Sequence, residues 1–492
     1  MLNREKTCKI ILFLLGLVLA SLSFPSKTLW FGPLAWIGFV PLLYVTETLE
    51  DKKALLVNWL FFLGLLISLF WLNPFVETRR FYEPAVYLLL LLLALVYPLL
   101  YASVLILAKR VSSKYNAYLR PFLYAGFWVS LEYLFTILPF CFPFSLAITQ
   151  TKSPLFLQLV PFLGIYGVSF LLISCNVAIF QFLFYRKREF LFPILMILFL
   201  NTSYGLFRLA LIDPPKEWVK VGIVQPNVNW EKSLYSNNRF FLNISLAQLF
   251  QLSAKVKKLD IPQLIVWPEL SANCYLLQTE SKMLETKIKE IHVPLLVGTY
   301  YYDYLEKKTC NAAALISEAG NPIGIRRKNK LFPFFEDAAY KSNDQIVPLA
   351  FDRGIKNIGA MLCFESLLPQ VSISLVKGGA DALVLMANGA WFGETRWPYL
   401  HMGYIVFRAL ETGRWAVQVN NSGPTLAVSP QGLMSQVIPT NKTAVAVVQV
   451  ASQTKDTFYV QSNEMFPKLI LILSYSLFLL SINPVKGVRK KD

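Results

Sequence analysis

Three residues of the types that carry out acyl transfer lie near short apolar runs in the second half of the chain. Cys363 ends the run Ile358–Leu362, and Glu269 follows Leu264–Trp267 with one proline between them. Lys328 lies between these two positions, in a basic stretch. A thiol can attack a carbonyl carbon, a carboxylate can take and return the proton, and an ammonium can stabilise the oxyanion. The three residue types predict an enzyme that moves an acyl group through a thioester.

Each of the three residues also has a structural interpretation. A lone cysteine is more often a packing residue than a nucleophile, Glu269 could cap the next segment, and Lys328 could lie on a solvated face or contact lipid headgroups. Lys330 competes for the lysine role. We prefer catalysis because all three residues follow or adjoin predicted strand ends, where α/β sheets bind ligands. The helix-like segment Ser366–Val376 is expected to give Cys363 thiolate character.

The polar stretch from about Pro214 to Asn463 predicts a layered α/β domain. Helical spacing of apolar residues occurs at Asn237–Lys258, Ser366–Val376 and Trp397–Glu411. Strand-like runs recur at Val219–Val224, Leu264–Val266, Leu295–Gly298, Ala312–Ile316, Ile355–Leu362, Ala382–Met386, Trp415–Val419, Thr425–Ser429 and Ala444–Val450. The glycine-rich loops that hold nucleotide phosphates are missing from the sequence, so nucleotide binding has no support.

The rest of the chain is apolar enough to lie in a membrane. Of all residues, 55% are hydrophobic and only 16% are charged, which is unusual for a soluble domain. Eight blocks predict spans: Ile10–Phe24, Trp30–Val45, Ala54–Leu72, Ala85–Leu107, Phe122–Leu138, Leu155–Phe184, Phe190–Ile212 and Leu469–Ile482. Glu132 lies within one of them, where a carboxyl group either faces a cavity or is hydrogen-bonded to a neighbouring helix.

Basic residues occur mainly in alternate connecting segments, and such segments stay in the cytoplasm. They are Arg4, Lys6 and Lys9; Lys52 and Lys53; Lys109, Arg110, Lys114 and Arg120; Arg186, Lys187 and Arg188; and Lys486, Arg489, Lys490 and Lys491. The other short loops hold Lys27, Arg79, Arg80 and Lys152. Both termini are therefore predicted inside and the polar stretch outside. Much of the net charge of +17 then sets topology and contacts anionic lipid, so no nucleic-acid partner is expected.

These observations predict three parts of the chain. Residues 1–213 form an N-terminal membrane domain of seven transmembrane helices, 214–463 a catalytic domain on the periplasmic or extracellular face, and 464–492 a C-terminal transmembrane helix with a basic cytoplasmic tail. Six cysteines without a C-x-x-C spacing and two histidines make a metal site improbable, and no cofactor is expected. Cys274 and Cys310 could form a disulfide in an oxidising compartment.

The order Pro-Glu, Lys and Cys-aromatic-acid resembles the triad of the nitrilase superfamily. Membrane spans on both sides narrow the resemblance to the apolipoprotein N-acyltransferase family, over nearly the whole chain. Further stretches resemble the family's motifs: Trp128–Glu132, Phe142–Phe144, Tyr166–Phe170, Val224–Gln225, Lys328–Glu336, Asn388–Gly393, His401, Arg408–Arg414 and Asn420–Gly423. The chain departs from the family at Phe335 and Gly389, where Gly and Asp are usual, and at Phe364, where Tyr is common.

The resemblance implies a multi-span α-helical membrane protein with an external nitrilase-like α/β domain, an αββα sandwich. It implies Glu269 as general base, Lys328 as oxyanion stabiliser and Cys363 as nucleophile. The same resemblance gives supporting roles to Glu336, Glu365 and Phe364, and offers Trp230 and Trp391 as substrate contacts.

The implied reaction takes a fatty acyl chain from a membrane phospholipid and leaves a lysophospholipid. The acceptor is the α-amino group of the N-terminal diacylglyceryl-cysteine of a lipoprotein, and the implied location is a bacterial inner membrane with a periplasmic catalytic domain. A membrane-tethered amidase or nitrilase-type hydrolase, in which water replaces the amine, is the alternative function. A catalytically inactive scaffold is a third, against which the complete triad argues.

Overall fold

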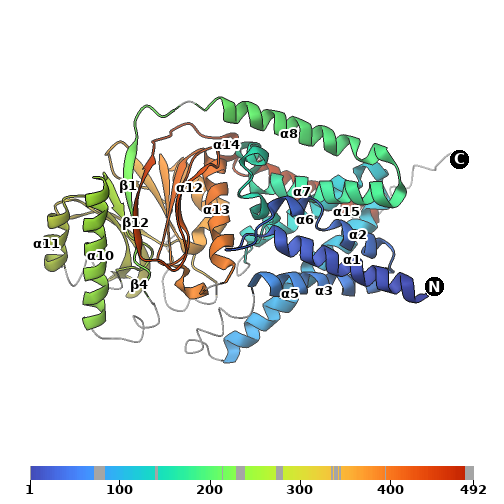
Figure 1. The fold of residues 1–492 in the computed structure, drawn as a ribbon, viewed down its shortest axis with the longest axis horizontal. Helices are drawn as coiled ribbons and strands as arrows, with labels where there is room; N and C mark the ends of the chain where they lie inside the picture. The colour runs from blue at the N-terminus through green and yellow to red at the C-terminus, as the bar shows by residue number, and fades with distance from the viewer. Residues whose placement is uncertain are drawn as a thin grey trace.

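The structure is a computed structural model in which a bundle of helices lies against a two-sheet α/β domain (Figure 1). It describes residues 2–70, 84–138, 142–212, 214–228, 239–272, 281–333, 336, 342, 345–393 and 395–482. The N-terminus lies at the end of the helical part that is farthest from the sheets, and α13 (Trp397–Thr412) lies between the sheets and the helical part (Figure 1).

The helical part contains six helices that are long and apolar enough to cross a membrane, counted over the described residues. They are α1 (Leu2–Ser23), α3 (Asp51–Phe70), α5 (Pro84–Ser112), α7 (Val160–Tyr185), α8 (Phe192–Ala210) and α15 (Met465–Ile482). The remaining elements of this part are α2 (Val40–Glu47), α6 (Arg120–Ile137), η1 (Gly32–Trp36), η2 (Ala117–Leu119), η3 (Leu146–Gln150), η4 (Pro154–Leu157) and η5 (Arg188–Phe190).

The segment Trp30–Val45, predicted as a single span, is divided into η1 and the eight-residue helix α2. Pro33 and Pro41 lie at the starts of these two pieces, where a missing backbone N–H costs nothing. Inside one continuous helix, each proline would kink or break it. The 18-residue helix α6 is not among the six membrane-length helices. The number of crossings stays a prediction.

The α/β domain consists of two six-stranded sheets. The first has the order β12-β1-β2-β3-β4-β5 and the second β11-β10-β9-β8-β7-β6. The strands are β1 (Val219–Gln225), β2 (Leu264–Val266), β3 (Leu295–Asp303), β4 (Lys308–Ile316), β5 (Pro322–Arg327), β6 (Leu349–Ala350), β7 (Asn357–Leu362), β8 (Ala382–Ala387), β9 (Trp415–Asn420), β10 (Thr425–Val428), β11 (Met434–Ile438) and β12 (Ala444–Val450). The helices are α10 (Arg239–Leu259), α11 (Ser281–Ile291), α12 (Pro369–Lys377), α13 and α14 (Phe458–Ser462), with η6 (Cys363–Leu367) and η7 (Gly389–Phe392) between strands and helices.

The strands show how alternating side chains build four layers. In β2, Leu264 and Val266 point between the sheets, whereas Ile265 packs with apolar residues of α10 and α11. In β7, Ala360 and Leu362 face the first sheet, whereas Met361 packs with residues of α12 and α13. Successive side chains of a strand point to opposite faces, so each sheet is covered on both sides. The result is the αββα sandwich expected for the external domain.

All nine predicted strands of this domain are present, and β5, β6, β11 and α11 were not predicted. β5 begins at Pro322 and contains Gly324, and both residue types argue against a strand. β6 has only two residues. The strands β5, β6 and β11 form by pairing with neighbouring strands, and the sequence does not show this pairing.

Candidate active site

Glu269 follows β2 and is buried, with 3% of its surface exposed. The Trp-Pro-Glu turn crosses directly over Gly298 of β3: a Cβ on Gly298 would lie 2.3 Å from the Pro268 carbonyl oxygen and 2.5 Å from the Glu269 Cα. Glycine is therefore required at this position for the carboxylate to reach its place. Asn311 of β4 holds the carboxylate by donating from Nδ2 to Glu269 Oε1 at 2.8 Å.

Lys328 follows β5 and lies between two carboxylates. Its Nζ is 2.9 Å from Glu269 Oε1 and 2.8 Å from Glu336 Oε2, and 1% of the residue is exposed. Asn311 also donates to Glu336, at 3.3 Å. Burial opposes the charge on the ammonium, but the carboxylates outweigh it and raise the pKa of Lys328 above its usual value. Lys330, the competing lysine, is exposed.

Cys363 ends β7 as the first residue of η6, and its backbone has a φ of 46°. Such a conformation costs a residue with a Cβ about 1–3 kcal/mol and is concentrated at active sites. Cys363 is partly exposed, whereas Glu269 and Lys328 are buried. Of the three predicted catalytic residues, Cys363 is therefore the one that a substrate can reach most easily.

The prediction that a helix end gives Cys363 thiolate character is wrong for the resting protein. Although the residue is partly exposed, poor hydration around its sulfur and the negative charge of Glu269 raise the pKa of the thiol well above its usual value, against Lys328 and a backbone hydrogen bond from Asn388. The long helix α12 begins only at Pro369, after η6. Burial also raises the pKa of Glu269, against the opposing charge of Lys328. A neutral thiol beside a carboxylate of raised pKa is the arrangement for proton transfer between them.

Glu365 has a structural role beside the nucleophile. It forms a two-pronged ion pair with Arg326, at 2.7 and 2.9 Å, and both side chains are completely buried. Its oxygens also accept from the backbone N–H groups of Leu362, at 2.8 Å, and Asn329, at 2.7 Å. Although burial opposes ionisation, Arg326 and these donors hold the pKa of Glu365 below its usual value. Glu365 thus ties the end of β7 to the segment that carries Lys328.

His401 of α13 supports the nucleophile from the other side. Its Nε2 lies 3.1 Å from the carbonyl oxygen of Cys363 and 3.0 Å from Ser366 Oγ. Burial lowers the pKa of His401 to about 4, so the ring is neutral at ordinary pH. It positions the backbone of Cys363 and is no general base.

Four aromatic side chains form a cluster beside the nucleophile: Phe142 of the helical part, and Phe332, Phe364 and Trp397 of the α/β domain. The Phe142 ring centroid lies 5.7 Å from that of Phe332, 5.9 Å from that of Phe364 and 4.9 Å from that of Trp397. Phe364 directly follows Cys363, so the aromatic cluster gives the site an apolar side suited to an acyl chain.

The other predicted site residues are placed as follows. Trp230 and Phe335 lie outside the described residues, and of Trp391 only the backbone, in η7, is described. Gly389 donates its N–H to Asn420 Oδ1 at 2.7 Å. Cys310 is buried and free, and Cys274 lies outside the described residues. Over the described part of the chain, no three His, Cys, Asp or Glu side chains are grouped closely enough to hold a metal ion.

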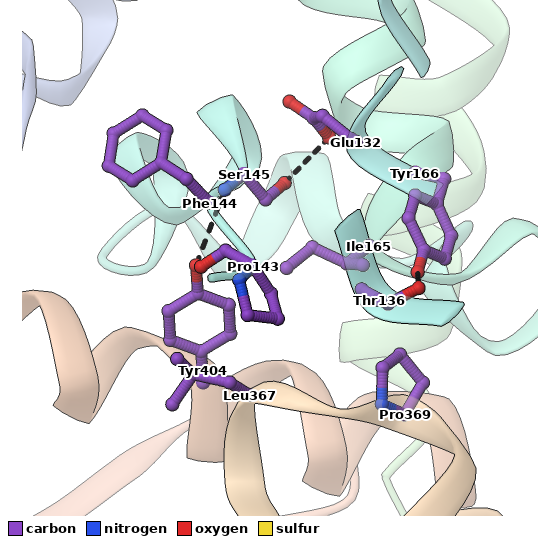
Figure 2. A pocket seen from close by; sticks show the side chains of 10 residues that line it. All are labelled: Glu132, Thr136, Pro143, Phe144, Ser145, Ile165, Tyr166, Leu367, Pro369 and Tyr404. Carbon is purple, nitrogen blue, oxygen red and sulfur yellow. Dashed lines mark hydrogen bonds between the residues drawn. The ribbon is translucent and has the colours of Figure 1, made fainter. Parts of the chain in front are cut away.

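Glu132 lies where the helical part meets the α/β domain, and it is hydrogen-bonded on both oxygens. It accepts from Trp128 Nε1 at 2.8 Å and from Ser145 Oγ and Leu146 N at 2.9 Å each. Ser169 Oγ is a further donor, at 3.1 Å. Both predicted interpretations of Glu132 hold, because it also lines a cavity of about 10 Å³, on the order of the space one water needs (Figure 2).

Figure 2 shows Tyr404 of α13 pointing from the α/β domain towards the loop that Glu132 holds. Its hydroxyl donates to the Pro143 carbonyl oxygen at 3.2 Å and lies 3.3 Å from Ser145 N. The loop at residues 142–145 is thus fixed by Glu132 from one domain and Tyr404 from the other. The same loop delivers Phe142 to the aromatic cluster.

A second buried contact joins α7 to α13. Gly164 breaks α7 with a φ of 67°, and the Tyr459 ring occupies the space where a Cβ would lie, at 2.2 Å. The break frees the Ile165 N–H, which donates to Glu411 Oε1 at 2.8 Å. Arg408 Nη2 lies 2.9 Å from the other Glu411 oxygen, and both side chains are fully buried.

Sequence reasoning missed Asn311, Arg326 and the positioning role of His401. Asn311 is the last polar residue before the apolar run of β4. Arg326 and Arg327 end β5, and Lys328 directly continues it. Because successive side chains of a strand point to opposite faces, this position could have shown that Arg326 and Lys328 share one face, which is buried, and that Arg327 lies on the other.

Comparison with known proteins agrees with this fold. The family model for the apolipoprotein N-acyltransferase N-terminal domain matches residues 16–178, and that for carbon-nitrogen hydrolases matches residues 224–458. The first model covers most of the helical part before α8, and the second covers the two-sheet domain.

Curated relatives match along nearly their whole length. The apolipoprotein N-acyltransferase of Geobacter metallireducens is 29% identical over 486 residues, which cover 91% of this chain and 90% of that protein. Apolipoprotein N-acyltransferase 2 of Treponema denticola is 28% identical over 521 residues, 94% of this chain and 95% of that protein. Among solved structures, Saccharomyces cerevisiae Nit3, of the nitrilase superfamily, has 14% identity, a TM-score of 0.40 and coverage of 56% of this chain and 98% of its own. The chain belongs to the apolipoprotein N-acyltransferase family.

Proposed function

We propose that the protein transfers a fatty acyl chain from a membrane phospholipid to the α-amino group of the N-terminal diacylglyceryl-cysteine of lipoproteins, through a thioester on Cys363. Family membership makes it a multi-pass membrane N-acyltransferase. The acyl donor, the thioester and the location in a bacterial inner membrane, with the α/β domain on the periplasmic side, are the proposal. Glu269, Lys328 and Cys363 are its catalytic residues, supported by Glu336, Glu365 and Phe364.

In the first half-reaction, Glu269 takes the proton of the Cys363 thiol while the sulfur attacks the ester carbonyl carbon of the phospholipid. The Lys328 ammonium stabilises the negative charge that develops on the carbonyl oxygen. Collapse of this intermediate breaks the ester C–O bond, and Glu269 returns the proton to the departing glycerol oxygen. A lysophospholipid leaves, and the acyl chain remains on Cys363.

In the second half-reaction, the α-amino group of the lipoprotein attacks the thioester carbonyl carbon. Glu269 takes a proton from the attacking nitrogen, the C–S bond breaks, and the proton returns to the sulfur of Cys363. The products are the N-acylated lipoprotein and the original thiol. No oxidant, metal ion or further co-reactant is needed to balance either step.

The single observation that carries the proposal is the buried Lys328, paired with Glu269 and Glu336, beside a partly exposed Cys363 at the end of β7. A structural cysteine has no need of this charged surrounding. The aromatic cluster supports a lipid substrate, because Phe142 enters it from the helical part and so joins the site to the membrane-type helices.

The experiment is mass spectrometry of lipoprotein N-termini from cells that lack their own enzyme and express this chain. Expression of the wild-type protein should add one fatty acyl mass to the diacylglyceryl peptide, on the α-amino group. The Cys363→Ser variant at equal membrane abundance is the matched control and should leave that amine free. Free amines in both strains would contradict the proposal.

A membrane-tethered hydrolase is the second candidate, favoured by the match to the carbon-nitrogen hydrolase model. The two functions differ in what attacks the thioester. An N-acyltransferase must hold its acyl-enzyme intact in water until the amine arrives, whereas a hydrolase loses it at once. The lifetime of the acylated protein without an amine, compared with the lifetime after a diacylglyceryl peptide is added, separates them.

A further inference from the structure

Arg396 is a half-buried cation where the α/β domain meets the end of α1. Its Nη1 donates to the carbonyl oxygen of Ser21, in the last turn of α1, at 2.8 Å, and lies 3.4 Å from Ser21 Oγ. The last turn of α1 contains no basic residue of its own, so Arg396 places a positive charge at the negative end of that helix.

The contact with α1 leaves most of the guanidinium unused. Within the described residues, Arg396 forms no ion pair, and Nη1 is the nitrogen that donates. Nε and Nη2 are not among the nitrogens that are buried without a partner, so they remain open to solvent. The Nε–Nη2 edge of an arginine is a planar pair of donors that matches two oxygens of a phosphate.

Arg396 is next to a residue that reaches the catalytic centre. Trp397 belongs to the aromatic cluster, and its ring centroid lies 6.3 Å from that of His401. His401 in turn contacts the carbonyl oxygen of Cys363 at 3.1 Å. Arg396 thus directly precedes, at the start of α13, a residue that is linked through His401 to the backbone of Cys363, on the side of the site where α1 ends.

Two other cations lie in the segments around the end of α1. Lys27 follows α1 and is exposed. Lys152 is also exposed, and its Nζ lies 4.4 Å above the Trp30 ring. Of the three, Arg396 is the one whose neighbour in sequence is part of the aromatic cluster.

We propose that Arg396 binds the phosphodiester of the donor phospholipid through its Nε–Nη2 edge. The proposal rests on the proposed function and names the contact by which the headgroup is recognised. Glycerol joins the phosphate to the reacting ester, so a phosphate on Arg396 orients the ester towards Cys363 while the acyl chain follows the aromatic cluster. The contact contributes to binding of the donor and not to the chemical step.

The test compares two acyl donors in single-turnover acylation of Cys363 in the full-length protein. One donor is phosphatidylglycerol in mixed micelles, and the other is the p-nitrophenyl ester of the same fatty acid, which has no phosphate. Arg396→Gln should raise the half-saturating concentration of phosphatidylglycerol about tenfold or more, with an unchanged rate at saturation. With the nitrophenyl ester it should match the wild type.

Lys152→Gln is the matched control, because Lys152 is a cation of the same region but has no link to the aromatic cluster. This variant should be acylated by both donors as the wild type is. Arg396→Lys keeps the charge at the end of α1 and loses the planar edge. It should therefore weaken the binding of phosphatidylglycerol and leave acylation by the nitrophenyl ester unchanged. Inorganic phosphate should compete with phosphatidylglycerol in the wild type if the contact accepts free phosphate; lack of competition, with the donor selectivity intact, assigns the site to the lipid headgroup.

Three results would overturn the proposal. If Arg396→Gln weakened acylation by both donors equally, Arg396 would serve only to dock the domain on α1. The same conclusion would follow if Arg396→Lys fully restored the use of phosphatidylglycerol. Unchanged use of phosphatidylglycerol in Arg396→Gln would remove the phosphate contact. A wild-type protein that is acylated by the nitrophenyl ester but never by a phospholipid would instead contradict the proposed function, whatever Arg396 does.

Discussion

The catalytic centre and the domain junction both bury charged side chains, but they direct them at different partners. At the centre, two carboxylates, Glu269 and Glu336, share one ammonium, Lys328, beside a thiol that is partly exposed. At the junction, Glu132 and Glu411 direct oxygens at backbone N–H groups of the neighbouring segments. The centre thus retains a carboxylate that can exchange a proton, whereas the junction uses its carboxylates to fix the backbone.

This difference separates the expected effects of mutation. Removing the ammonium from the centre should change rates more than stability, because Asn311 still donates to both carboxylates and Glu336 is partly exposed. Removing a charge from the junction should loosen the contact between the domains and reduce stability. The predictions below test that division, in order of decreasing effect.

Glu411→Ala should cause the largest loss of stability. It leaves Arg408 buried without its partner and the Ile165 N–H without an acceptor, at a cost of about 3–5 kcal/mol. Thermal unfolding of the detergent-solubilised protein measures it. Lys287→Ala, which breaks the exposed pair with Glu290, is the control and should cost under about 1 kcal/mol. Similar unfolding temperatures for the two variants would show that the junction pair does not join the domains.

Lys328→Ala should lower the rate of acylation about 100- to 1,000-fold without reducing the unfolding temperature to the same extent as Glu411→Ala. Lys330→Ala is the control, since that lysine is exposed, and its effect should be mild. Lys328→Arg should restore little, because a planar fork does not replace a compact ammonium between two carboxylates. Single-turnover release of lysophospholipid is the measurement. A large loss at Lys330 with normal acylation in Lys328→Ala would reverse the assignment.

Glu132→Ala should cost about 1–3 kcal/mol of stability, since buried donors from Trp128 and Leu146 lose their acceptor. Glu132→Gln keeps an accepting oxygen and should lose less. Because the loop that Glu132 holds carries Phe142, the alanine variant should also weaken donor binding in the way that Phe142→Ala does. In the double variant these two losses of donor binding should not add; full additivity would separate Glu132 from the aromatic cluster.

The acylation rate should fall on the acid side as Glu269 is protonated. Burial raises the pKa of Glu269 above its ordinary value near 4.5, so the carboxylate is present above that raised pKa and is lost as the pH falls through it. In the pH–rate profile, the fall on the acid side (the acid limb) therefore lies above pH 4.5. His401→Gln should keep the same limb, because burial lowers the pKa of His401 to about 4. If the acid limb moved in His401→Gln, the histidine and not Glu269 would be the group that takes the proton.

The sequence predicted the elements whose patterns are local. Runs such as Leu264–Val266 are short and apolar, and these strands were predicted from the chain alone. Glu269, Lys328 and Cys363 could be proposed as a catalytic triad because each lies at or beside the end of such a strand. The resemblance to a family then distinguished Lys328 from Lys330, which the residues by themselves did not.

What could not be predicted depends on contacts between segments far apart. The stretch from Arg326 to Lys330 looks like a solvated basic face, yet Arg326 pairs with Glu365 and Lys328 with Glu269, so both are buried. The thiolate prediction for Cys363 failed for the same reason, because burial and Glu269 determine its pKa. The role of Glu132 required knowledge of the loop near Ser145 that packs on it.

Mass spectrometry of the protein after brief exposure to a phospholipid tests the central claim most directly. The protein is incubated with the phospholipid without an amine acceptor, quenched in acid and digested. The account predicts one fatty acyl mass on the peptide that contains Cys363, removed by hydroxylamine, and no adduct in Cys363→Ser, which should keep the wild-type unfolding temperature. An adduct on Cys310, or continued release of lysophospholipid by Cys363→Ser, would contradict it.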